Sequence, residues 1–267
     1  MNYYVFDHHN FWQWTPSNSD LLSSNVVFMW ADYPFVDSIK TLQSFGKKII
    51  VYEHGFGALF DYELNKKEYL ADGYLALGDA SRDSLARAGV SPNRILITGN
   101  PVYDDIKATK HEGKNALFVA LHWVRDVSEY NQILFDQLVR AYPEFDWTIK
   151  LIDKTGDVIT DKRKWYNTVE SDYILKDIKE KLPEYDMVFT PKCSTFESFA
   201  RLMGIPVYVV DKEESFKGVG EPNRMPMNNT YLKIGEKLPK QKPIDMGKYI
   251  SRPSLNFDLI LDWCKTL

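Results

Sequence analysis

Acidic and histidine side chains follow two early apolar segments of the chain, and these residue types can move protons. Asp32 comes after the apolar run 26–30, whereas Glu53 and His54 come after the run 48–52. A histidine or a carboxylate whose pKa lies near the working pH can take a proton from a hydroxyl group. Two alternatives stay open, because Asp32 can instead cap the following helix, and His54 can form structural hydrogen bonds under the glycine turn that follows it.

Two adjacent histidines, His8 and His9, follow the first apolar run, 3–6. Loops at the carboxyl ends of strands carry functional residues in open α/β sheets. The pair can therefore contact an acceptor substrate or bind a metal. It can equally lie in an ordinary loop, with one ring hydrogen-bonded and the other solvated.

A third candidate site lies in the second half of the chain, where Ser194 and Thr195 precede a helical segment that ends at Gly204. The first backbone N–H groups of a helix have no partner within the helix, and the positive end of the helix dipole lies there. A diphosphate fits such a site. The alternative is a capped helix without a ligand.

Cationic side chains lie in two further segments of the second half. His122 and Arg125 come just after the apolar run 116–121, where a cation can neutralise a diphosphate. Arg125 can instead pair with neighbouring acidic residues at the surface. The long polar segment 212–229 contains Arg224, which can reach the same ligand, although the segment can also be an insertion without a function.

Alternating strand and helix patterns must position these residues. Short apolar runs predict buried strands of parallel sheets, at 3–6, 26–30, 48–52, 74–77, 95–97, 116–121, 147–152, 187–190 and 205–211. Amphipathic segments between several of these runs predict crossover helices. The polar segment 107–115 separates two sets of strands. We therefore expect an α/β protein with two small Rossmann-like domains, residues 1–110 and 111–267.

Composition narrows the classes of partner and of cellular setting. The net charge of −4 and the pI near 5.8 disfavour a long nucleic-acid-binding surface. The two cysteines, Cys193 and Cys264, lie far apart, so no disulfide framework is expected. The sequence begins without a signal-peptide pattern, and no apolar run reaches membrane-spanning length. A cytoplasmic location is the expectation.

The segment 85–104 carries the first of two motifs that resemble a known group of enzymes. It reads L-x-x-x-G-V followed by I-x-x-T-G-N-P-x-x-D, with Gly99 and Asn100 in the turn. It resembles the end of the N-terminal domain in the UDP-N-acetylglucosamine 2-epimerase group and in related GT-B glycosyltransferases, including polysaccharide and CDP-glycerol-type transferases. Those proteins have two Rossmann-like domains facing across a cleft, and the second domain holds most of a nucleotide-sugar donor. The alternative is a strand–helix–strand unit of any doubly wound enzyme.

The second motif, S-T…A-x-x-x-G-I-P-V at 194–207, is similar to the donor-binding helix of GT-B transferases. Many relatives carry a glutamate on this helix that holds the donor ribose. Phe199 stands at that position here, and Glu197 is a candidate offset by half a turn. The D-S-G-G motif of the epimerases has no counterpart before Ser194, which counts against epimerase activity.

The first-half segment VYEHGFG, 51–57, resembles two family motifs that differ in register by one residue. Its likeness to H-V-E-A-G-L-R of the epimerases places Glu53 on their functional glutamate, whereas its likeness to the H-G loops of the transferases makes His54 the acid or base. His122 matches the start of the epimerase motif H-R-x-E-N, and Arg125 is displaced from its arginine. The glycine-rich first loop of many GT-B enzymes is missing from this sequence.

We predict that the chain transfers a sugar from a nucleotide diphosphate sugar, expected to be UDP-linked, to a hydroxyl acceptor. The expected donor-binding residues are Ser194, Thr195, His122, Arg125, Gly99, Asn100, Glu197 and Arg224. His54, Glu53 or Asp32 would activate the acceptor, with His8 and His9 on the acceptor side. The acceptor class is open among glycan, lipid, protein and modified DNA.

The resemblance implies that no metal ion and no other cofactor is needed, because helix dipoles and cations offset the charge of the leaving diphosphate. One alternative function is that of a 2-epimerase-like enzyme, which eliminates and re-adds the nucleotide. The other is that of a non-catalytic module that binds a nucleotide or a glycan.

Overall fold

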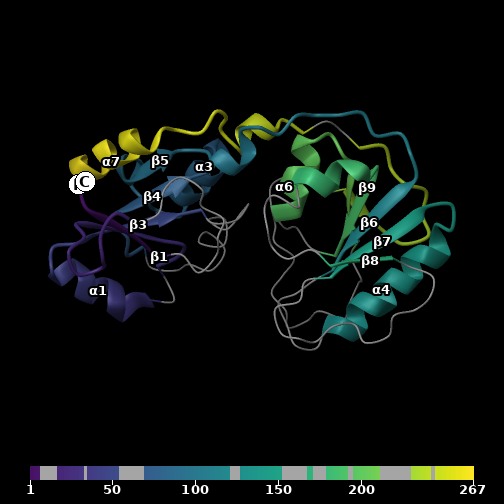
Figure 1. Cartoon of the computed structure of the whole chain (residues 1–267), viewed down its shortest axis with the longest axis horizontal. Coiled ribbons are helices and arrows are strands. Elements are labelled where there is room, and N and C mark those ends of the chain that lie inside the picture. Colours follow the sequence, from purple (N-terminus) through teal and green to yellow (C-terminus); the bar gives the residue numbers. More distant parts are fainter. Residues whose placement is uncertain are drawn as a thin grey trace. The chain divides into compact units, whose positions relative to one another are not determined.

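The computed structural model describes residues 1–6, 17–32, 35–53, 69–120, 127–151, 167–170, 179–191, 195–210, 230–241 and 244–267. The chain forms two compact units, which Figure 1 shows as ribbons. Unit 1 consists of Met1–Asp105 together with Asp245–Leu267, and unit 2 consists of Ile106–Ile244. The expected division at residue 110 lies near the first boundary. The C-terminal residues differ from the expectation, because they pack on unit 1 and the second unit does not continue to residue 267.

Unit 1 contains a five-stranded parallel sheet whose strands lie in the order of the sequence. The strands are β1 (Tyr3–Phe6), β2 (Val26–Met29), β3 (Lys48–Tyr52), β4 (Gly73–Ala76) and β5 (Ile95–Ile97). Parallel neighbours are joined by right-handed crossovers. A sheet in sequential order therefore carries all its own connections on one face.

Alternate residues of these strands build a hydrophobic core on each face of the sheet. The core that contains Val27 is covered by α1 (Val36–Ser44) and α3 (Asp79–Arg87). The core that contains Phe28 is covered by α7 (Phe257–Thr266), which comes from the C-terminus of the chain. Figure 1 shows α7 on the opposite side of the sheet from α1. The C-terminal helix thus completes unit 1.

Unit 2 contains a six-stranded parallel sheet in the order β11-β10-β9-β6-β7-β8. The strands are β6 (Asn115–Val119), β7 (Asp146–Leu151), β8 (Asn167–Glu170), β9 (Met187–Thr190), β10 (Val207–Val210) and β11 (Thr230–Leu232). Numbered within the unit, this is the order 3-2-1-4-5-6 of dinucleotide-binding folds. Unit 2 therefore has the strand order of a Rossmann-like domain.

Two helices cover opposite faces of this sheet (Figure 1). The helix α4 (Val127–Ala141) buries Leu134, Phe135 and Leu138 in a core that also contains Phe118. The helix α6 (Thr195–Leu202) follows β9 and lies on the other face. Short 3-10 turns of the chain lie at Pro92–Arg94, Pro101–Tyr103, Leu182–Glu184 and Met246–Lys248.

The sequence predicted nine of these strands to within two residues at each end, and it missed β8 and β11. Both missed strands lie at the edges of the unit 2 sheet, and β11 has three residues. A short edge strand needs no continuous apolar run, since one side of it has no neighbouring strand. Among the described helices, none is long and apolar enough to cross a membrane.

Candidate functional site

The strand order of unit 2 reverses between β6 and β9, which lie side by side in parallel register. Open α/β sheets bind ligands beyond the carboxyl ends of the strands at such a reversal. The two strands end at Val119 and Thr190. The segment after β6 contains His122 and Arg125, and the segment after β9 contains Ser194. The described ends of β6 and β9 thus lie at one edge of one sheet, whereas His122, Arg125 and Ser194 lie outside the described part of the chain.

The helix α6 begins at Thr195, close behind the end of β9. Its amino-terminal end therefore lies at the carboxyl edge of the sheet, next to the reversal. The free N–H groups and the dipole of a helix start favour an anion at this place. This geometry supports the sequence prediction for Thr195 as a backbone element, and the side chain of Thr195 is not among those described.

A buried ion pair lies within α6. Arg201 Nε is 2.8 Å from Glu197 Oε1, and the two side chains are 6% and 0% exposed, respectively. The second oxygen of Glu197 and the Nη2 of Arg201 are buried and have no hydrogen-bond partner among the described residues. Glu197 stands in the first turn of the helix, so Arg201 cancels a negative charge close to the proposed anion position. Sequence reasoning missed Arg201, although its spacing of four residues from Glu197 is a usable helical signal.

The carboxylate of Asp32, at the carboxyl end of β2, is fully buried and fulfils a structural role. Its Oδ2 accepts hydrogen bonds from Leu70 N–H at 3.0 Å, from Ala71 N–H at 3.3 Å and from the Tyr74 hydroxyl at 2.6 Å. The alternative of a helix cap is wrong, because α1 begins after Phe35 and has no side-chain cap. Asp32 holds β2 to β4, and a role in acceptor activation stays a prediction.

Glu53 is also buried, at the carboxyl end of β3, where it is 1% exposed. Its Oε2 accepts a hydrogen bond from Leu77 N–H at 2.9 Å, and its own N–H donates to Leu75 O at 3.0 Å. The residue therefore joins the ends of β3 and β4. Its proposed role as the functional glutamate stays a prediction that must be reconciled with this structural role.

Gly99 and Asn100 contact the protein itself rather than an open edge. Gly99 has φ of +62°, and a Cβ atom there would lie 2.2 Å from Ser251 O. The Asn100 side chain is buried and caps the turn Pro101–Tyr103 by accepting a hydrogen bond from Val102 N–H at 3.0 Å. The tight turn at Gly99 and Asn100 is thus explained by the C-terminal segment packed against it, and a donor-binding role gains no support from the described contacts.

Besides His122, Arg125 and Ser194, four predicted site residues lie outside the described residues. They are His8, His9, His54 and Arg224. Within the described part of the chain, no three His, Cys, Asp or Glu side chains gather closely enough to hold a metal ion.

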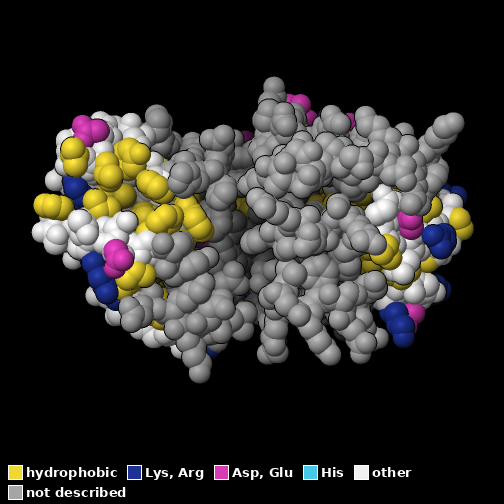
Figure 2. Space-filling model, turned by 90° about the horizontal axis from the view of Figure 1, so that it is seen from below, with side chains coloured by type: hydrophobic (Ala, Val, Ile, Leu, Met, Phe, Trp, Pro, Cys, Tyr) yellow, Lys and Arg dark blue, Asp and Glu magenta, His cyan; other side chains and the backbone are white. Residues whose placement is uncertain are grey.

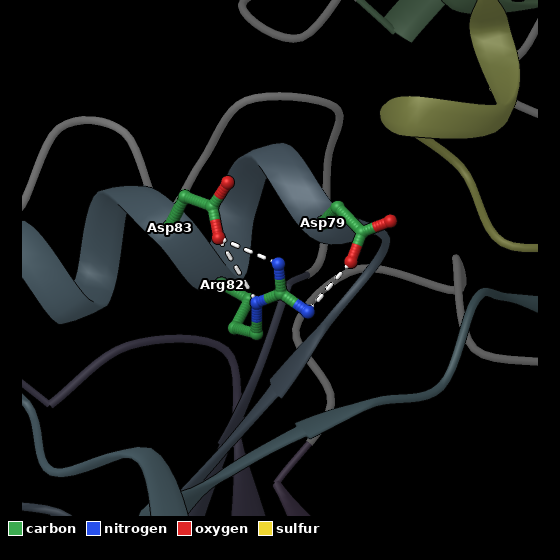
Figure 3. A network of polar contacts seen from close by, with 3 residues as sticks. All are labelled: Asp79, Arg82 and Asp83. Atoms are coloured by element: carbon green, nitrogen blue, oxygen red, sulfur yellow. Dashed lines mark hydrogen bonds and ion pairs between the residues drawn. The ribbon is translucent and has the colours of Figure 1, made fainter.

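The start of α3 already carries a carboxylate of the protein. Arg82 bridges Asp79 and Asp83 through two contacts of 2.7 Å, as Figure 3 shows, and these side chains are 43% to 50% exposed. The hydrogen bond to Asp83 raises the pKa of Arg82. Two carboxylates and one guanidinium leave this helix start net negative, so it is a poor place for a phosphate.

The described surface on the face drawn in Figure 2 carries charges of both signs. Lysine, arginine and acidic side chains lie near one another there, and hydrophobic side chains gather over unit 1 (Figure 2). A polyanion such as nucleic acid is bound by a continuous basic surface. The described residues of this face form no such surface.

Known structures share the fold of this chain, whereas no protein-family model and no curated protein matches its sequence. A UDP-GlcNAc 2-epimerase from Neisseria meningitidis, bound to UDP-GlcNAc, matches with a TM-score of 0.51 and 15% identity, over 70% of this chain and 59% of that chain. MnaA of S. aureus, with UDP, matches with a TM-score of 0.50 and 17% identity, over 71% and 57%. The lipopolysaccharide outer core galactosyltransferase WaaB matches with a TM-score of 0.41 and 15% identity, over 70% and 57%.

The first two matches carry the fold assignment. They confirm, at the level of the fold, the resemblance of the sequence to the UDP-GlcNAc 2-epimerase group. The present chain spans only 57% to 59% of their length.

Proposed function

We propose that unit 2 binds a nucleotide diphosphate sugar and that the chain transfers the sugar to a hydroxyl acceptor. The reversal of strand order between β6 and β9 carries this proposal. It brings the end of β6 and the start of α6 to one edge, and His122 and Arg125 follow β6 in the sequence. A diphosphate there would need N–H donors and positive charge. The structures of similar fold are bound to UDP-GlcNAc or UDP, which makes UDP the first nucleotide to test.

The buried pair on α6 supports the same assignment. A lone Glu197 carboxylate in the first turn would repel a diphosphate, and Arg201 removes that repulsion.

The acceptor side of the proposal lies at the carboxyl edge of unit 1. The ends of β4 and β5 are covered by the C-terminal segment, since Ser251 N–H donates to Leu77 O and Leu255 N–H donates to Thr98 O, both at 2.7 Å. An acceptor therefore has the ends of β1, β2 and β3 left to it. All five candidates for acid–base or acceptor contact follow those strands in the sequence, namely His8, His9, Asp32, Glu53 and His54.

Binding of UDP is the first test of the donor site. At a concentration of about 100 times its dissociation constant, a ligand adds about 2.7 kcal/mol of stability, which a thermal-shift assay detects. We expect UDP to stabilise the wild type and to lose that effect in a Ser194→Ala/Thr195→Ala double variant.

A matched control for this test is the double variant Thr41→Ala/Ser44→Ala, which removes the same two hydroxyl types from exposed positions of α1 in unit 1. It should keep the full response to UDP. If no nucleoside diphosphate stabilises the wild type, the transferase proposal and the epimerase alternative both lose their support.

A 2-epimerase-like reaction is the second candidate function. The observation that favours it is the fold shared with the Neisseria epimerase and the presence of Glu53 at the end of β3. Incubation with UDP-GlcNAc and no acceptor separates the two candidates. Formation of the 2-epimer, followed by NMR, supports the epimerase, whereas UDP release that requires an added hydroxyl acceptor supports the transferase.

A further inference from the structure

The strand β1 is an edge of the described unit 1 sheet, because it pairs with β2 on one side and ends the strand order. Successive residues of a strand direct their backbone N–H and C=O groups to opposite sides. The Asn2 carbonyl accepts hydrogen bonds from the residues that lead into β2. The backbone groups of Tyr3 and Val5 therefore face outward, where a strand of another molecule could bond to them.

A short polar segment of the same unit, residues 17–19, bonds to these outward groups and is called the strap below. Tyr3 N–H donates to Asn18 Oδ1 at 2.7 Å, and Val5 N–H donates to Ser17 Oγ at 2.9 Å. Tyr3 O accepts from the Ser19 hydroxyl at 3.1 Å and from Asn18 N–H at 3.3 Å. The strap thus gives β1 the hydrogen bonds of a neighbouring strand, mostly through side chains.

The chain that follows the strap is fixed as well. Asp20 Oδ1 accepts a hydrogen bond from Ser23 N–H at 2.9 Å, which closes a turn. The ammonium group of the buried Lys47 donates to Leu22 O and to Ser24 O, both at 2.7 Å. Hydrogen bonds from a charged donor are stronger than those between neutral groups. The strap is therefore held beside β1 by its own bonds and by the anchored turn after it.

The sequence of β1 makes this edge prone to pairing. The strand reads YYVF, so each residue is aromatic or β-branched and none is charged. Exposed edge strands of this composition associate with other strands, whereas short or charged edge strands do so less. The edges β5 and β11 have three residues each, and the edge β8 carries Glu170. Among the edges of the two described sheets, β1 alone has four residues and no charge.

We propose that the strap keeps the β1 edge from pairing with the same edge of a second copy of this chain. A second copy presents an identical uncharged strand, and two antiparallel copies of one edge can meet on a twofold axis. Such a strand can reach the outward groups of Tyr3 and Val5 only after the strap side chains have left them. This inference concerns unit 1 alone and is independent of the proposed function.

The local part of the proposal is tested in dilute solution with the double variant Ser17→Ala/Asn18→Ala. Loss of one neutral hydrogen bond changes an opening equilibrium by about 3- to 10-fold. We expect the amides of Tyr3 and Val5 to exchange faster by that factor when exchange is followed by NMR. The control Ser91→Ala/Asn93→Ala removes the same two side-chain types from exposed positions before β5 and should leave both amides unchanged.

Self-association is measured by sedimentation velocity over a range of chain concentrations. We expect the Ser17→Ala/Asn18→Ala variant to associate about tenfold or more tightly than the wild type and the control, because two outward donors become available. Exchange of the Tyr3 and Val5 amides should slow again as the concentration rises, which locates the contact at β1. Unchanged association, or association that leaves these two amides unprotected, would overturn the proposal.

A milder variant decides the question if circular dichroism shows that the double variant is misfolded. Ser17→Ala removes one exposed hydroxyl group and frees the Val5 N–H alone. It should speed exchange of the Val5 amide, leave the Tyr3 amide at its wild-type rate, and raise association by a smaller factor than the double variant. Faster exchange of Val5 without any increase in association would show that the strap is local structure only.

Discussion

Truncation of one side chain of the C-terminal helix should strongly destabilise unit 1, because this helix covers the second face of the sheet. Ile260 of α7 is fully buried in the core that contains Phe28, and this face of the sheet carries none of the described crossover helices. The test substitution is Ile260→Ala. Its control is Leu259→Ala, the preceding residue of the same helix, which is 53% exposed.

The expected magnitude follows from burial. Replacing a buried isoleucine by alanine removes apolar contacts and leaves a cavity, at a cost of about 2–5 kcal/mol. An exposed substitution of the same kind costs less than about 0.5 kcal/mol. Because a whole domain is stable by only about 5–15 kcal/mol, the Ile260 variant should lose a large part of the stability of unit 1.

Hydrogen exchange is the appropriate assay, because a chain of two units does not unfold in one step and a single melting temperature mixes them. A loss of about 3 kcal/mol corresponds to roughly 100-fold faster exchange of β2, β3 and β4 amides. Unit 2 amides should keep their wild-type rates. Equal effects from Ile260→Ala and Leu259→Ala, or acceleration confined to unit 2, would refute the view that the C-terminal helix completes unit 1.

Two further predictions concern charge. Arg201→Ala should destabilise unit 2 by about 3–5 kcal/mol in chemical denaturation, because it leaves the buried Glu197 carboxylate without a counter-charge. The control Arg82→Ala breaks an exposed network and should cost less than about 1 kcal/mol. Similar losses of stability for the two variants would contradict this account. Burial raises the pKa of the Cys264 thiol from 9.0 to about 12, so the folded chain keeps this proton at pH values where the unfolded chain loses it. Stability of unit 1 should therefore be unaffected by this group below pH 9 and fall as pH rises from 9 toward 12, and Cys264→Ala should flatten that decline in a titration followed by hydrogen exchange or circular dichroism.

Most strands and the position of the donor helix could be predicted from the sequence, because both depend on local patterns. The apolar runs at β3 and β9 are buried strands at the expected residues, and α6 begins at Thr195 as its flanking residues indicated. The residues that follow strand ends in the sequence stay predicted candidates for the carboxyl edges. Their catalytic roles stay predictions, because the position of a residue after a strand does not determine what its side chain binds.

The roles of Asp32 and Gly99 could not be predicted in this way, because their partners are distant in the sequence. Asp32 bonds to Tyr74 and to the segment before it, and Gly99 faces Ser251, some 150 residues later. A carboxylate at a strand end looks the same in sequence whether it binds a substrate or the next strand. Only the folded arrangement separates these cases.

The sequence by itself predicted two α/β units with a boundary near residue 110 and a helix that begins near Thr195, because the hydrophobic period and the start signals of helices act over a few residues. The tertiary structure decided the order of the strands, and with it the reversal between β6 and β9 that marks the candidate donor site. It also decided that the last residues return to unit 1. Sequential strand order leaves one face of that sheet uncovered, and the apolar stripe of α7 gains its stability by covering it.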